Sequence, residues 1–479
     1  MPESPKPDDA DRQSNDADWR KRAEEAERER DALRRERDQL QRETERLRHR
    51  IDHLKRQLDD ARRAGFRQAA PFAKLLKKNP KRPGRKAGRA YGPKARRQCP
   101  PRVDERYAVP LPAHCPGCAG PITPTGIASQ YQEELPVTRV VVRQFDIQVG
   151  RCDRCRRRVQ GRHPLQTSDA LGAAAAQLGA QVIALVVVLN KQLGLSFGKI
   201  VTLLQQLYGL TVTRSGLVHA VHRAARQAGP TYAALCARVR GSPMVSPDET
   251  GWKVAGRLQW LWAFATPDTT IYRIQPGRGF DEAATVLGAE FDGVLVRDGW
   301  APYRQFAQAA HQTCLAHLLR RCRLLRIDYP RARFVRDVQG VLQDALALRD
   351  RHRAGTISAH GVAVARGHLI SRLSDRLAQS SAVPDVERFG RHLTREFPAI
   401  WSFLFDPSID ATNWRAEQAL RPVIVTRKVC GGNRSRRGAD SQQILASVIR
   451  TTSQRQLNPH DVLASLLHAR TPHVTAELN

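Results

Sequence analysis

Residues 246–266, SPDETGWKVAGRLQWLWAFAT, decide the expected fold of this chain. Aromatic and aliphatic residues lie on both sides of VAGR, a pattern typical of two strands joined by a turn. With the sequence around it, the stretch predicts three consecutive strands, PMVSPDE, LQWLWAFA and TTIYRIQP. We expect Trp252, Trp260 and Trp262 to pack the sheet rather than to stack on nucleic-acid bases.

The sequence that follows alternates between helical and extended patterns. GFDEAATVLGAEF reads as a helix, GVLVRDGW as a strand, APYRQFAQA as a helix, and HQTCLAHLLRRCRLL as an extended segment that becomes a helix. Hairpins followed by such alternation predict a mixed sheet with helices on its faces. We assign this α+β core to residues 241–330 and 406–435, a helical insertion to 331–405, and a basic helical tail to 436–479.

Three acids stand out in this core. Asp248 is expected to close the first strand and Asp298 to close its neighbour GVLVRD, while Glu417 lies on the helix NWRAEQALRP. Three carboxylates in one crevice would hold two Mg²⁺ ions, or Mn²⁺, for chemistry at a phosphodiester. Glu249, directly after the first acid, should point its side chain elsewhere. For any single acid, the alternative is a solvated loop residue or a helix cap.

The charge of the chain points to a polyanionic partner. Its 479 residues include 79 Lys and Arg against 47 Asp and Glu, a formal net charge of +32. Double-stranded DNA is the first candidate and an anionic membrane surface the second. Residues 61–103 contain 15 basic residues and no acid, whereas residues 241–330 contain 10 basic and 9 acidic residues. DNA binding and acidic chemistry are therefore expected in different parts of the chain.

Hydropathy argues against a membrane protein. No segment offers the roughly twenty apolar residues of a membrane-spanning helix, and QVIALVVVLN at 181–190 reads as a buried helix. The polar N-terminus does not resemble a signal peptide. Nine cysteines, an odd number, fit reduced thiols better than a disulfide framework. We expect a cytoplasmic, nucleoid-associated protein without membrane contact.

The N-terminal region combines a segment expected to be disordered, residues 1–17, with a heptad pattern over residues 18–64. Leucines or alanines recur every seven residues at positions 26, 33, 40, 47, 54 and 61. This stripe predicts a coiled coil, most simply of a homodimer. The alternative is a single charged helix with local ion pairs.

Residues 65–103 form a candidate DNA-binding arm. KKNPKRPGRKAGRAYGPKARR combines Pro, Gly and dense positive charge, so no core can form there. Such a segment can follow phosphates or enter a minor groove. A solvated linker is the alternative. The candidate DNA contacts are Lys77, Lys78, Lys81, Arg82, Arg85, Lys86 and Arg89.

Two cysteine pairs lie within residues 104–165: Cys115 with Cys118 in CPGC, and Cys152 with Cys155 in CDRC. Each pair presents two thiolates from a tight turn, and four thiolates suit a structural Zn²⁺. The strand-like RVVVRQFDIQVG between the pairs suits a zinc-ribbon-like hairpin. The alternative is a redox pair or ordinary buried cysteines, but zinc would supply stability that this core-poor segment lacks.

Residues 166–240 read as helices with a helix-turn-helix layout. SFGKIVTLLQQLYGLTVTRSGLVHAVHRAARQ gives a helix, a short turn at Gly209, and a second helix with Thr213 as its N-cap. Arg214, at the start of the second helix, is a candidate DNA contact. Plain core packing would explain the same pattern.

Several motifs together resemble one family. DETGWKVAGRLQWLWAFAT, GVLVRDGWAPY, CLAHLLRR, NWRAEQALRPVIVTRKVCGGNRSRRGADS and TTSQRQLNP occur in the order found in transposases of the insertion-sequence 66 family. The heptad helix, the PGRKAG arm, the paired cysteines and the helix-turn-helix also match the layout of that family, so the resemblance covers nearly the whole chain. The sequence departs from it at Trp414 and Gln418, where NNRAERALRP is usual.

The resemblance implies a DDE transposase with an RNase H-like core and the triad Asp248, Asp298 and Glu417. Cys314 and His317 match the Cys-x-x-His element of such enzymes, where the histidine would contact the scissile phosphate, order the site, or be structural. The implied activity is metal-dependent cleavage of element ends and strand transfer, with small accessory proteins. A DNA-binding regulator without chemistry and an RNase H-like nuclease that cleaves without joining are the alternatives.

Overall fold

The computed structural model describes residues 22, 25, 27–41, 43–45, 47, 51, 99–135, 140–172, 177–379 and 381–478. The chain divides into two compact units, residues 1–86 and 87–479, and each is described by itself. Outside the described residues lie the segment 1–17 and the seven cations of the arm, Lys77, Lys78, Lys81, Arg82, Arg85, Lys86 and Arg89.

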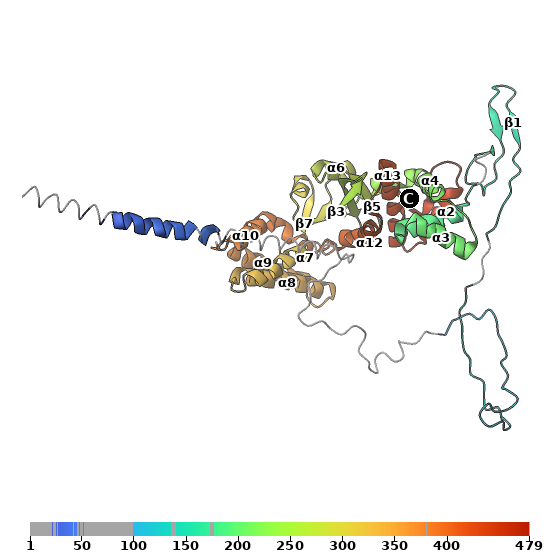
Figure 1. Cartoon of the computed structure of the whole chain (residues 1–479), viewed down its shortest axis with the longest axis horizontal. Helices are drawn as coiled ribbons and strands as arrows, with labels where there is room; N and C mark the ends of the chain where they lie inside the picture. The colour runs from blue at the N-terminus through green and yellow to red at the C-terminus, as the bar shows by residue number, and fades with distance from the viewer. Residues whose placement is uncertain are drawn as a thin grey trace, which may run out of the picture. The chain divides into compact units, whose positions relative to one another are not determined.

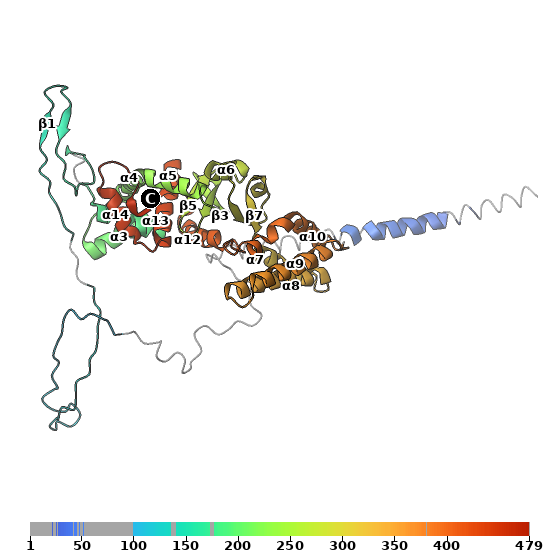
Figure 2. The same ribbon diagram turned by 180° about the vertical axis from the view of Figure 1, so that it is seen from behind.

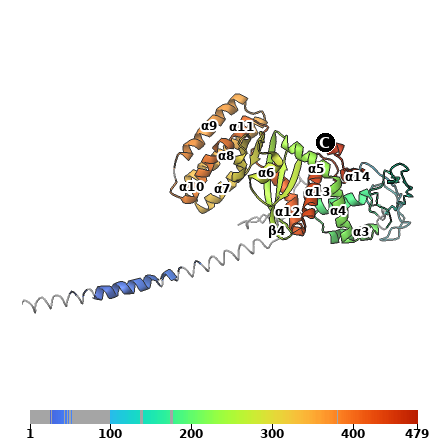
Figure 3. The same cartoon turned by 90° about the horizontal axis from the view of Figure 1, so that it is seen from above.

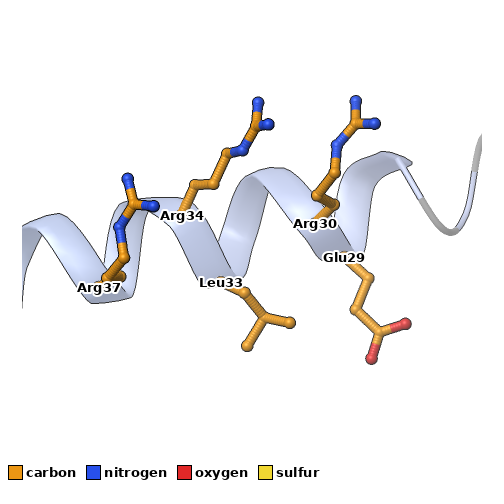
Figure 4. Close-up of a pocket in the computed structure, with 5 residues that line it drawn as sticks. All are labelled: Glu29, Arg30, Leu33, Arg34 and Arg37. Carbon is orange, nitrogen blue, oxygen red and sulfur yellow. The ribbon is translucent and has the colours of Figure 1, made fainter.

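The described part of the first unit is helical. Its heptad leucines are more than half exposed. Figure 4 shows a hollow on this helix, with Leu33 and Glu29 on one side and Arg30, Arg34 and Arg37 on the other. An exposed leucine stripe is the surface that a coiled coil would bury, and the homodimer stays a prediction.

A five-stranded mixed sheet lies at the centre of the second unit (Figure 1). Its strands lie in the order β5-β4-β3-β6-β7; β3, β4 and β5 are antiparallel, whereas β6 and β7 run parallel to β3. The arrangement fits the RNase H-like core that the sequence led us to expect. The bounds are β3 (Met244–Val254), β4 (Arg257–Ala265), β5 (Thr270–Gln275), β6 (Val294–Arg297) and β7 (Ala310–Thr313).

The predicted strands and turn form, with one difference. Ala255 and Gly256, with φ of 51° and 78°, make the two-residue turn between β3 and β4, and this left-handed geometry matches the twist of the two strands. The prediction that Asp248 closes the first strand is wrong, because β4 pairs with β3 on both sides of it and β3 continues to Val254. The acid lies instead just beyond Val245, where pairing with β6 ends.

Helices cover both faces of the sheet, as Figure 2 shows from behind. Trp252 on one face packs against α12 (Trp414–Cys430) and α13 (Arg436–Gln454). Trp262 on the other face is fully buried in a cluster that other helices share, so both tryptophans pack the sheet as predicted. Those helices include α2 (Ala180–Val187), α3 (Phe197–Tyr208), α4 (Arg214–Gln227), α5 (Gly229–Arg240), α6 (Phe280–Leu287) and α14 (Pro459–His468).

Side chains of helix α13 also accept hydrogen bonds from the backbone along the outer edge of β5. Gln443, Ser447 and Thr451, spaced four residues apart, accept hydrogen bonds from alternate backbone N–H groups of β5 at 3.0, 2.8 and 3.1 Å. An edge strand would otherwise leave these donors without a partner strand. The segment expected to be a basic tail is helical, as predicted, and it holds the edge of the sheet.

The segment 331–405 is mostly helical, as predicted, and it forms a hydrophobic cluster with α7 (Leu315–Asp328) and Val296 of β6. Figure 3 shows α8–α11 on one side of the sheet and α3 and α4 on the other. The segment 301–309 differs from its predicted helix, because only Ala301–Gln305 forms a single 3-10 turn before β7. The elements of the insertion are α8 (Arg333–Arg353), α9 (Ala359–Leu377), α10 (Pro384–Glu396), η5 (Phe397–Ile400) and α11 (Ser402–Phe405).

The apolar run 181–190 folds as α2 and the π-helix η3 (Val188–Gln192). Within the described residues, no helix has the length and apolar character needed to cross a membrane. Lys191 in η3 is only 8% exposed, and its Nζ donates to Gln442 Oε1 at 3.0 Å. Burial lowers the pKa of Lys191 to about 8.

This buried lysine predicts a pH-dependent stability. An unfolded lysine has a pKa near 10.4, so above pH 8 the unfolded chain binds more protons than the folded one, and stability rises with pH. From pH 7.5 to 9.5 this group alone should add about 2 kcal/mol, a gain that Lys191→Met should remove. Urea unfolding of both proteins at the two pH values measures it. Equal pH dependence in the two would contradict the depressed pKa.

Candidate active site

The register of β3 and β6 places two of the predicted acids at equivalent positions along the two strands. Val245 of β3 pairs with Leu295 of β6, and Asp248 and Asp298 each lie three residues further along the parallel strands. Residues at matching positions of parallel neighbours point to the same face. The predicted pairing of these strands is therefore confirmed, and Asp298 directly follows the last residue of β6.

Helix α12 brings the third acid to this face. Side chains alternate along a strand, so Asp248 shares its face with Trp252, which packs against α12. Glu417 lies in the first turn of that helix, as the sequence predicted. Its negative charge, like that of Asp298, contributes to the raised pKa of Asp248.

The electrostatics of this group suit a divalent cation. Burial, followed by the charges of Glu249, Asp298 and Glu417, raises the pKa of Asp248 to about 8. A hydrogen bond from the N–H of Glu249, at 2.8 Å, opposes this shift only in part. A cation with oxygen ligands would relieve the repulsion on Asp248. Among the described residues, the oxygens of the three acids do not all lie within 4.8 Å of one another, but carboxylate oxygens are the donor type that Mg²⁺ or Mn²⁺ prefers.

Hydrogen bonds tie together the segments that carry the three acids. The N–H of Cys314 donates to the carbonyl of Arg297 at 2.8 Å, and the N–H of Asn413 donates to Cys314 Sγ at 3.2 Å. Asn413 Nδ2 also donates to the carbonyl of Pro247 at 2.8 Å. Pro247 and Arg297 directly precede the two aspartates, and Asn413 is the residue before α12. Sequence reasoning missed this asparagine, whose one signal was its place before a helix.

Glu249 points to the opposite face of the sheet, as expected. Its carboxylate is buried and accepts hydrogen bonds from Arg278 Nε at 2.6 Å and from the Tyr303 hydroxyl at 2.5 Å. The Arg278 guanidinium lies 4.0 Å from the ring centre of Trp300. The N–H of Trp300 in turn donates to Asp298 Oδ1 at 2.9 Å. Glu249 therefore supports the Asp298 loop from the opposite face of the sheet, through Arg278 and Trp300.

A second buried ion network holds the same loop from the helical insertion. Arg297 Nη1 donates to Glu396 Oε2 at 2.7 Å and to the carbonyl of Asp298 at 3.0 Å. The other Glu396 oxygen pairs with Arg304 at 2.7 Å, and the Thr313 hydroxyl adds a bond of 2.5 Å. No sequence signal identifies this network, because Arg297 and Glu396 are 99 residues apart.

The Cys-x-x-His element lies against the third acid. Cys314 is the residue before α7, and His317 follows within its first turn. His317 Nε2 lies 3.9 Å from Glu417 Oε1, and Arg320 Nη2 lies 4.0 Å from the same oxygen. Glu417 therefore lies against the start of α7, and its charge also acts on Asp248.

The two cysteine pairs form separate tight turns. Hydrogen bonds from backbone N–H groups within each turn lower the pKa of Cys115 and of Cys152. Among the described residues, the four cysteines do not form a cluster of metal ligands. The structural zinc and its four ligands, Cys115, Cys118, Cys152 and Cys155, stay predictions.

The expected strand between the cysteine pairs is mostly absent. Of the described part of this stretch, residues 140–150, only the end contributes to β1 (Val149–Arg151), which pairs antiparallel with β2 (Arg158–Gln160). The second cysteine pair forms the turn between these short strands, instead of following a long hairpin. Few side chains of this segment are buried, so little packing is available to extend the strands.

The helix-turn-helix layout is present in α3 and α4. Gly209 ends α3 in a left-handed conformation with φ of 66°, and the Thr213 hydroxyl accepts from the N–H of Gly216 at 3.0 Å, which confirms the N-cap. One face of α4 is buried. Arg214 is exposed at the first position of this helix, and its contact with DNA stays a prediction.

Comparison with known proteins identifies a family. The model of the family described as "Transposase IS66 family" matches residues 175–441. Two relatives from Sinorhizobium fredii (strain NBRC 101917 / NGR234) are also similar: uncharacterized protein y4qI, 25% identical over 232 residues, and uncharacterized protein y4jD, 26% identical over 299 residues. These matches cover 43% of this chain and 43% of y4qI, and 54% of this chain and 56% of y4jD. The chain thus spans about half the length of the curated relatives it matches.

Proposed function

This chain belongs to the IS66 family of transposases, and from that premise we propose that it cuts DNA at the ends of an insertion sequence and joins the freed ends to a target. The observation that carries the proposal is the pKa of Asp248, which burial and the charges of neighbouring acids, Asp298 and Glu417 among them, raise to about 8. A carboxyl group whose charged form is disfavoured in this way is relieved by a bound cation. Those three residues would hold the ions.

The chemistry assigned to this site is two displacements at phosphorus. In the first, water forms a bond to a phosphorus and the bond from that phosphorus to the 3′ oxygen breaks, which frees a 3′ hydroxyl. In the second, this 3′ oxygen forms a bond to a target phosphorus, the bond from that phosphorus to the 3′ oxygen of the target strand breaks, and the target keeps a 3′ hydroxyl. Bound Mg²⁺ would activate the attacking oxygen and stabilise the leaving one. Glu249 and Glu396 fix the Asp298 loop from two sides, and His317 orders Glu417 or contacts the phosphate. No covalent protein–DNA intermediate is needed.

Other parts of the chain would hold the DNA. The basic arm and the exposed Arg214 are assigned to phosphate contacts, which makes binding steeply salt-dependent because each neutralised phosphate releases counterions. The exposed leucines of the first unit would pair two protomers, one for each element end. Structural zinc at the two cysteine pairs would stabilise the segment between the arm and α2.

A cleavage and joining assay tests this function. Full-length protein is incubated with labelled DNA carrying the inverted repeats that flank its gene, in Mg²⁺, in Mn²⁺, or with a chelator. We expect nicks at the repeat ends and a joined product with either ion, and neither product after chelation. Binding without cleavage would instead identify a regulator, and cleavage without joined product would identify a nuclease. A gel-shift in Ca²⁺ confirms that the DNA is bound.

A further inference from the structure

Three potential metal ligands with different donor atoms converge where α7 meets α12. The sulfur of Cys314, a ring nitrogen of His317 and a carboxylate oxygen of Glu417 lie within 4.8 Å of one another. Cys314 directly precedes α7 and His317 lies in its first turn, whereas Glu417 lies in the first turn of α12. Within the described ranges, no other group of three such residues is this close.

The sulfur of Cys314 lies within reach of the other two ligand atoms. Cys314 is fully buried. The backbone N–H of Asn413 donates to its Sγ at 3.2 Å, which fixes the sulfur where α7 meets α12. Burial and the charge of Glu417 keep the pKa of this thiol above its usual value although backbone N–H groups oppose the shift. A cation bound at the sulfur would replace the proton and neutralise the charge of Glu417.

The imidazole is also available for coordination. His317 Nε2 lies 3.9 Å from Glu417 Oε1, which is too long for a hydrogen bond. Two ligand atoms about 2.0–2.2 Å from one tetrahedral ion lie roughly 3.5 Å apart, so a shift of a few tenths of an ångström would admit an ion between them. His317 Nδ1 is buried without a hydrogen-bond partner among the described residues. The ring therefore has a nitrogen lone pair that no described donor occupies.

From this geometry we propose that Cys314, His317 and Glu417 bind a borderline-soft divalent cation of the Zn²⁺ class. A thiolate and an imidazole select such an ion over Mg²⁺, which prefers oxygen ligands alone. Three protein ligands leave a fourth position open to water. The site shares Glu417 with the proposed Mg²⁺ group, but it rests on the three ligand atoms and needs no DNA chemistry. Arg320, 4.0 Å from Glu417, is half exposed and can turn away.

Cobalt spectroscopy on the full chain tests this site, because a thiolate bound to Co²⁺ gives a near-ultraviolet charge-transfer band and a tetrahedral ion gives strong visible bands. Wild type, Cys314→Ser and Cys322→Ser are titrated with Co²⁺ in excess Mg²⁺. Cys322 is a matched control, because it is a buried cysteine of α7, the helix that Cys314 precedes, and lies outside the cluster. We expect Cys314→Ser to lose one Co²⁺ equivalent with its bands and Cys322→Ser to keep the wild-type spectrum.

A second variant keeps the test decisive if Cys314→Ser does not fold. His317→Ala should keep the thiolate but weaken binding of this Co²⁺ equivalent by about tenfold or more, which corresponds to about 1.4 kcal/mol. Spectra and affinities that stay the same in both variants would refute the cation site. The cation site and the proposed function can fail separately. If the wild-type protein cleaves DNA in Mg²⁺ but shows no Co²⁺ band that depends on Cys314, only the cation site is refuted. A Cys314-dependent band in a protein that never cleaves DNA removes only the transposition proposal.

Discussion

Asp298→Asn should lower DNA cleavage and strand transfer by at least about 10³-fold, equivalent to about 4 kcal/mol of activation free energy. An amide is neutral, so it withdraws one charged ligand from the proposed cation group while keeping the size of the side chain. Its carbonyl oxygen can still accept the hydrogen bond from Trp300, 2.9 Å long in the wild type. The loss is therefore expected in the chemical step and not in the fold.

The same variant should unfold at an unchanged or higher temperature. The Asp298 charge raises the pKa of Asp248, so its removal relieves repulsion on the Asp248 carboxylate. Activity is measured with labelled element ends in Mg²⁺, and stability by thermal unfolding without metal. Asp292→Asn, an exposed acid just before β6, serves as the control and should keep full activity. Full activity of Asp298→Asn would overturn the assignment of the acids.

Glu396→Ala should destabilise the second unit by about 3–5 kcal/mol, the range for breaking a buried ion pair. The Glu396 side chain is fully buried, and the partner guanidinium of Arg297 is 2% exposed. Truncation would leave that cation without its carboxylate in the interior, next to the loop that carries Asp298. Burial raises the pKa of Glu396, but the charge of Arg297 and the hydrogen bond from Thr313 outweigh it and hold the pKa below its usual value.

The pKa of Glu396 also gives the sign of a pH effect. A depressed carboxyl pKa contributes stability above the ordinary glutamate range, and this contribution is lost as pH falls through the folded-state value. Chemical unfolding of Glu396→Ala at neutral and acidic pH measures both effects, and the difference from wild type should shrink in acid. Asp344→Ala, which breaks an exposed pair with Arg372 at 2.9 Å, should cost less than about 1 kcal/mol. Similar costs for the two variants would contradict the buried network.

The predictions from sequence succeeded where the physics is local. Strand alternation and the VAGR turn define the β3–β4 hairpin, because side-chain period and turn geometry depend on neighbouring residues only. The same period places Asp248 and Glu249 on opposite faces of β3, as the structure has them. Local reasoning misjudged the end of β3, because strand length depends on the partner strand that continues beside it.

Sequence alone predicted the strands of the central sheet apart from the end of β3, the packing of Trp252 and Trp262, the N-cap of α4 and the helix that carries Glu417. It did not predict how short the strands beside the second cysteine pair are. The tertiary structure was needed to show that Asp248 and Asp298 lie at equivalent positions along two parallel strands. It was also needed to show that Asn413 and Glu396 bind the segments of these aspartates to distant elements. The physical reason is range: propensity and periodicity act over a few residues, whereas register and buried ion pairs join atoms separated by tens to hundreds of residues. Such contacts exist only once the whole core has packed.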